Sequence, residues 1–199
     1  MNMQASLASH THTHTHTPGE PSLWLLILGD MVIYGLFFLV FAHAYQGQPE
    51  LFGSSQQLLS QGFGVVNTLI LLTSSWFVVK GIQAVRRDPL VPAGRWFLLA
   101  LLCGGAFALL KVVEYGLKMW QGQQLTSNDF FMYYYLITGF HLVHVSVGMV
   151  VLFFMMRAAN RPHGDGQRLA FLESGATFWH MVDLLWIVIF PLIYLLGRS

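Results

Sequence analysis

The chain has 199 residues, of which 55% are hydrophobic and 10% are charged. A soluble globular domain carries about 25% charged residues, so this composition excludes an ordinary soluble domain and indicates an integral membrane protein. The formal net charge of +1 gives no electrostatic reason to expect a nucleic-acid partner, and the single cysteine, Cys103, excludes an internal disulfide.

The first 21 residues predict a disordered cytoplasmic tail. Within it, the stretch HTHTHTHT (10–17) alternates histidine with threonine. Alternating histidines are able to chelate a divalent metal ion, but a solvated tail without a ligand is the simpler expectation.

Five apolar segments follow this tail, and each is longer than the ~20 residues that a helix needs to cross a bilayer. Lipid offers no partners to backbone groups, so helices are the expected spanning structures. The sequence therefore predicts an all-α integral membrane bundle of five transmembrane helices within 22–199. The predicted spans are 22–45, 62–84, 95–118, 131–156 and 174–196.

The basic residues predict the orientation of the spans. They gather around the second and fourth loops, whereas the first and third loops together hold only Lys118. Positive residues stay on the cytoplasmic side, so the N-terminus is expected inside and the C-terminus outside. The residues that decide this are Lys80, Arg86, Arg87, Arg95, Arg157, Arg161 and Arg168.

Several ionisable residues fall well inside the predicted spans. A charged residue at the centre of a span costs about 3 kcal/mol on insertion scales, so such residues normally face the protein interior and pair there. These residues are Asp30, Lys111, Glu114, His141, His144, His180 and Asp183.

The spacing of these residues indicates which of them share a helix face. Residues three apart lie on one face, so Lys111 and Glu114 are able to pair within their own helix. By the same rule, His141 and His144 form one stripe in the fourth span.

His180 and Asp183 form a second stripe, in the fifth span, and Glu173 lies on that face nearer the cytoplasmic end. We expect the stripes of the fourth and fifth spans to meet each other rather than lipid. A contact between Asp183 and an imidazole would offset part of the desolvation cost.

Four chemical interpretations fit these stripes. His180 with either His141 or His144 would suit a bis-histidine haem, and the three histidines with Asp183 would suit zinc or iron. Buried acids and imidazoles also serve as proton or ion relays. A purely structural network that fixes the helix register is the fourth interpretation.

Four stretches, in order along the second to fifth spans, resemble the subunit III family of haem–copper oxidases. They resemble the family patterns NTxxLxxSS, GxxFLxxQxxEY, TGFHxxHVxxG and YWHFVDxxW. The stretches are VVNTLILLTSS (65–75), GGAFALLKVVEY (104–115), ITGFHLVHVSVG (137–148) and FWHMVDLLWIVIF (178–190).

Two residues depart from the oxidase pattern. The first span resembles the family helix that carries a membrane carboxylate, usually Glu after Ser, but here it is Asp30 after Gly29. Lys111 stands where the oxidase form has Gln. With only five spans and the opening GDM, the chain is most similar to the short NorE-like branch associated with nitric oxide reductase.

The resemblance implies an accessory subunit without a catalytic centre, haem or copper of its own, in a bacterial inner membrane. It implies that the chain packs beside the catalytic subunit of an oxidase or reductase, stabilises it and assists proton uptake. It also implies a structural phospholipid, and Asp30 as the membrane carboxylate facing lipid or the catalytic subunit. The buried polar network would comprise Lys111, Glu114, His141, His144, Glu173, His180 and Asp183.

Three other functions are weighed against this one. The chain would be subunit III proper of a cytochrome c or quinol oxidase if its partner is a terminal oxidase. It would be an autonomous transporter if Asp30, Lys111 and Glu114 line a path, although no internal repeat is evident. It would be a stand-alone dihaem electron carrier if the histidines bind haem.

Overall fold

The computed structural model describes residues 21–87, 93–160 and 166–196, and these residues form helices without any strand. The His/Thr-rich stretch lies outside the described residues. The helices are α1 (Pro21–Gly47), α2 (Pro49–Gln57), α3 (Gln61–Arg87), α4 (Gly94–Trp120), α5 (Asp129–Ala159) and α6 (Gly166–Tyr194).

Five of these helices, all except α2, are long and apolar enough to cross a membrane. They coincide with the five predicted spans, so the all-α fold and the number of spans are confirmed. The predicted bounds differ from the observed ones by up to eight residues, mostly because polar residues extend helices beyond the hydrophobic stretch. The α5 helix, for example, begins at Asp129, where the side chain of Asn128 accepts a hydrogen bond from the Phe131 amide at 2.9 Å.

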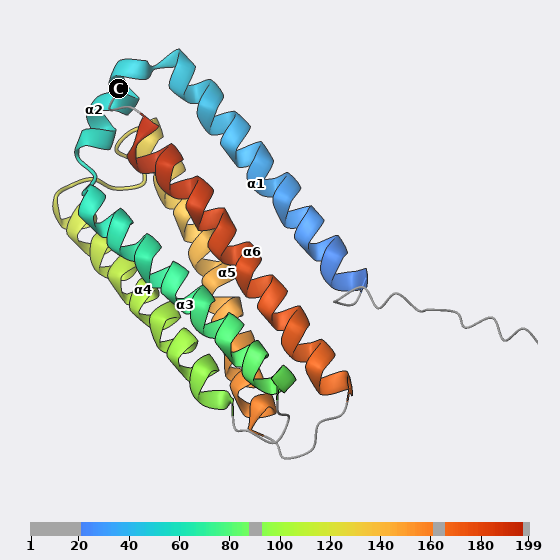
Figure 1. Ribbon diagram of the computed structural model, residues 1–199. Coiled ribbons are helices and arrows are strands. Elements are labelled where there is room, and N and C mark those ends of the chain that lie inside the picture. Colours follow the sequence, from blue (N-terminus) through green and yellow to red (C-terminus); the bar gives the residue numbers. More distant parts are fainter. Residues whose placement is uncertain (1–20, 88–92, 161–165, 197–199) are drawn as a thin grey trace, which may run out of the picture.

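The helices α3 to α6 form an antiparallel bundle, and α1 runs beside α5 and α6 (Figure 1). The start of α1 lies at the same end of the molecule as the end of α3 and the start of α6. The short α2 helix lies at the opposite end, near the end of α6.

The centre of the bundle is built around Trp179 of α6, which is fully buried. A Cβ atom at Gly104 of α4 would lie 2.9 Å from this indole, and one at Gly148 of α5 would lie 2.7 Å from it. Only glycine leaves room for the ring at these two positions, so the two glycines set how closely α4 and α5 approach α6.

The α2 helix is absent from the sequence prediction, because its nine residues are too few and too polar to resemble a span. Its Phe52 is fully buried in an aromatic cluster with Phe41 of α1 and Phe130 of α5. Its Gln56 donates to the backbone oxygen of Leu192 at 3.2 Å. The α2 helix thus ties the ends of α1, α5 and α6 together.

Candidate functional site

A buried ion pair lies near the α2 end of the bundle. The Lys111 Nζ atom donates to Glu114 Oε2 at 3.0 Å and to the Tyr194 hydroxyl oxygen at 2.9 Å. The Tyr194 hydroxyl in turn donates to Glu114 Oε1 at 2.7 Å. The intrahelical pair expected from the sequence is present, and Tyr194 of α6 completes a closed triad.

Aromatic rings enclose this triad. The Lys111 Nζ atom lies 5.0 to 5.4 Å from four ring centroids, and its side chain is fully buried. Ring faces attract a cation, so the rings add to the stabilisation given by Glu114. The rings belong to Tyr115, Tyr134, Trp186 and Tyr194. This arrangement fastens α4 to α6 and leaves the ammonium group closed to a substrate.

His141 is fully buried among aromatic rings. Its ring stacks on Trp186 with centroids 5.2 Å apart, and it meets Phe107 edge-on at 5.8 Å. Neither ring nitrogen has a hydrogen-bond partner within the described parts of the chain. His141 therefore packs as an aromatic core residue in this structure.

Asp183 is also buried, at 3% exposure. Its carboxyl group lies beside the Ser75 hydroxyl, although neither oxygen meets hydrogen-bond geometry with any described residue. The expected contact between Asp183 and an imidazole is not formed. In place of an imidazole, the α3 helix presents a hydroxyl to this acid.

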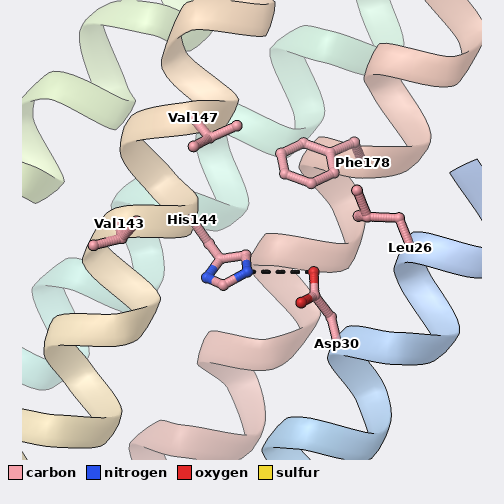
Figure 2. A pocket seen from close by; sticks show the side chains of 6 residues that line it. All are labelled: Leu26, Asp30, Val143, His144, Val147 and Phe178. Atoms are coloured by element: carbon pink, nitrogen blue, oxygen red, sulfur yellow. Dashed lines mark ion pairs between the residues drawn. The ribbon is translucent and has the colours of Figure 1, made fainter.

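His144 and Asp30 face each other across α5 and α1 (Figure 2). The His144 Nε2 atom lies 3.3 Å from Asp30 Oδ2, and the Nδ1 atom lies 2.9 Å from the Phe140 backbone oxygen. The Asp30 side chain is only 13% exposed and contacts α5 of the same chain. A carboxylate at mid-span gains more from an imidazole than from acyl chains.

A pocket of about 220 Å³ opens beside this pair. Apart from the two polar side chains, its walls are apolar (Figure 2). The wall residues are Leu26 of α1, Val143 and Val147 of α5, and Phe178 of α6.

The two remaining predicted residues each pair with α3. His180 Nδ1 lies 2.5 Å from the Ser75 hydroxyl oxygen, and Arg86 donates to Glu173 Oε1 at 2.7 Å. Glu173 thus belongs to the end of the bundle that carries the basic residues, away from Asp183. Sequence spacing could not identify these partners, because it gives no register between helices.

The single network expected from the sequence is therefore divided into separate contacts between helices. Within 21–87, 93–160 and 166–196, no three metal-binding side chains gather in one place. The imidazoles of His141, His144 and His180 point to three different partners.

The chain matches the family model described as "Cytochrome c oxidase subunit III" over residues 3–198. The chain belongs to the cytochrome c oxidase subunit III family. Membership of this family and the five long apolar helices together make it a multi-pass membrane protein.

Curated relatives within the family cover most of both chains. The chain is 30% identical to cytochrome c oxidase subunit 3 of Thermostichus vulcanus, over 86% of this chain and 88% of that protein. It is 32% identical to the protein of the same name from Synechocystis, over 86% and 72%. A more distant relative, at 25% identity over 87% and 84%, is cytochrome bo(3) ubiquinol oxidase subunit 3 of Pseudomonas putida.

Proposed function

We propose that the chain is a non-catalytic accessory subunit that stabilises the membrane-embedded catalytic subunit of a haem–copper respiratory complex. Membership of the subunit III family carries this proposal. The buried polar groups support it, because Lys111 and Glu114 satisfy each other inside the protein and offer no open site. Haem, copper and iron would then belong to partner subunits.

Co-purification from native membranes tests this function. The chain is expected to bring down a large haem-bearing membrane subunit, whereas the chain expressed alone is expected to show no Soret absorption band. A stoichiometric haem in the isolated chain would support the dihaem carrier instead.

The partner complex is proposed to be a nitric oxide reductase, with a terminal oxidase as the second candidate. Lys111 stands in place of the usual Gln, and Asp30 stands in place of Glu. These two departures from the oxidase pattern favour the nitric oxide reductase. The names of the relatives, which are cytochrome c and ubiquinol oxidase subunits, favour the second. Identifying the co-purified subunit by mass spectrometry decides between them.

A structural phospholipid is proposed beside α1. The pocket at Asp30 is open and mostly apolar, and its 220 Å³ suits part of an acyl chain rather than a whole lipid. Lipid extraction from the purified complex, followed by mass spectrometry, tests this expectation.

The protein is proposed to reside in a bacterial inner membrane with its N-terminus in the cytoplasm. Arg86, Arg95 and Arg157 lie at the end of the bundle where α1 begins, in agreement with the positive-inside rule (Figure 1). Labelling of cysteines introduced at either end, in intact cells, tests the orientation.

Assistance to proton uptake is proposed for the Asp30–His144 pair, which contains a carboxylate and an imidazole within a span. An autonomous transporter is the competing function. Flux into proteoliposomes that contain only this chain, abolished by Asp30→Asn, would favour the transporter.

A further inference from the structure

A serine–histidine pair lies at the middle of two membrane spans. Ser75 is near the centre of α3 and His180 is near the centre of α6. The Ser75 hydroxyl oxygen is 2.5 Å from His180 Nδ1. Both side chains therefore lie close to the middle of the bilayer, far from either headgroup layer.

The inner side of this pair is fixed by the bundle. Ser75 occupies Nδ1 of the imidazole, and the buried Asp183 carboxyl group lies next to Ser75. The ring is thereby held with its Nδ1 edge toward α3. Its other nitrogen, Nε2, lies on the opposite edge of the ring.

The Nε2 atom of His180 has no partner in the described parts of the chain. His180 is half-buried. Its Nε2 atom is not enclosed by the protein, so it reaches the accessible surface of the bundle. Acyl chains offer an imidazole nitrogen neither a donor nor an acceptor, and leaving it unpaired in hydrocarbon is costly. A polar group at this depth normally faces protein.

The residues around His180 form an apolar rim. On α6, Leu184 and Ile187 lie one and two turns further along the same side and are exposed. On α3, Leu72 and Val79 flank Ser75 on its side of the helix and are also exposed. We call these six residues the His180 face: Leu72, Ser75, Val79, His180, Leu184 and Ile187.

We propose that the His180 face docks against a membrane-spanning helix of the catalytic partner subunit, from which a polar group hydrogen-bonds to His180 Nε2. The inference rests on the proposed function, which supplies the partner. A polar atom within an apolar rim matches how transmembrane helices associate, by close packing together with hydrogen bonds between helices. The α1 helix does not take this place, because its own polar group, Asp30, is engaged with His144 on α5.

Substitution of His180 tests the hydrogen bond within the native complex. His180→Phe keeps an aromatic ring but removes the polar atoms. It is expected to lower the yield of co-purified haem-bearing subunit about three- to tenfold, as loss of about 0.6–1.4 kcal/mol predicts. His180→Gln, which still hydrogen-bonds, is expected to recover part of the yield. The matched control is His43→Phe, at an exposed histidine of α1, and it is expected to leave the yield unchanged.

Photo-crosslinking tests the face without disturbing His180. A photoreactive residue in place of Leu184, which is 55% exposed, is expected to form an adduct with the haem-bearing subunit. The same residue in place of Leu109 on α4, which is 66% exposed, is expected to label lipid only. Crosslinking from position 184 tests docking of the His180 face even if His180→Phe fails to fold.

Three results would overturn the proposal. They are equal yields for His180→Phe and His43→Phe in folded protein, an adduct at Leu184 with lipid only, or an adduct at Leu184 with a second copy of this chain. If the haem-bearing subunit still co-purifies in these cases, the proposed function stands without the His180 face. If the unaltered chain brings down no such subunit, the proposed function fails and this inference fails with it.

Discussion

The α1 helix and the α3–α6 bundle hold their polar groups in different ways. In the bundle, Lys111 and Glu114 are sealed from solvent at 0% and 1% exposure. Between α1 and the bundle, Asp30 and His144 are partly exposed beside an open pocket. In the most apolar stretch of α1, 17% of the residues are buried, compared with 56% in that of α6. The comparison shows a bundle with a sealed ion pair at its core and a further helix, α1, that packs on it through aromatic rings and a partly exposed polar contact at mid-span.

The largest effect is expected from breaking the ion pair of the bundle. Lys111→Met leaves Glu114 buried without its cation, so the free energy of unfolding should fall by about 3–5 kcal/mol. Unfolding of the protein in bicelles measures this change. The double variant with Glu114→Gln should recover much of the loss, and Lys80→Met, near the end of α3, should have little effect. A loss below about 1 kcal/mol for Lys111→Met would show that the bundle does not depend on this pair.

The second largest effect is expected from the close approach around Trp179. Gly104→Ala places a methyl group 2.9 Å from the indole, and such overpacking typically costs about 1–3 kcal/mol. Gly105→Ala is the matched control on the same helix, because a methyl group there meets nothing within 4 Å. Equal free energies of unfolding for the two variants would mean that the indole moves aside without cost.

A smaller effect, confined to α1, is expected from its polar contact. Asp30→Asn weakens the contact with His144, and hydrogen bonds between transmembrane helices contribute about 0.6–1.7 kcal/mol. Spin labels at Leu28 of α1 and Val150 of α5 should report a broader distance distribution in this variant. Labels at Leu109 of α4 and Val150 should report no change. Broadening of both distributions would contradict the separation of α1 from the bundle.

The smallest effect is expected at the basic end of the bundle. The Arg86 side chain is 58% exposed, and exposed ion pairs contribute about 0–1 kcal/mol. Arg86→Ala should therefore change the free energy of unfolding by less than about 1 kcal/mol, and added salt should reduce the difference further. A larger loss would place Glu173 among the structural contacts of the bundle.

The helices and one ion pair could be predicted from the sequence, because both depend on local spacing. A run of more than 20 apolar residues is sufficient to identify a span. The Lys111–Glu114 pair follows from a separation of three residues on one helix. Neither inference needs any knowledge of how the helices are arranged.

The contacts between helices could not be predicted in this way. His144 pairs with Asp30, and Glu173 with Arg86, because of the register between helices, which no local pattern encodes. The sequence does not single out Tyr194, because a tyrosine near the end of a span resembles an interfacial anchor. The α2 helix gives no recognisable pattern, because its apolar content is concentrated in two residues, Leu51 and Phe52.

The hydrogen bond from Gln56 to Leu192 joins residues that are 136 positions apart. During synthesis, Gln56 emerges long before its acceptor, because Leu192 belongs to α6. The bond therefore cannot form until α6 has been inserted. A protein truncated before residue 192 would therefore lack the bond that closes α2 onto α6.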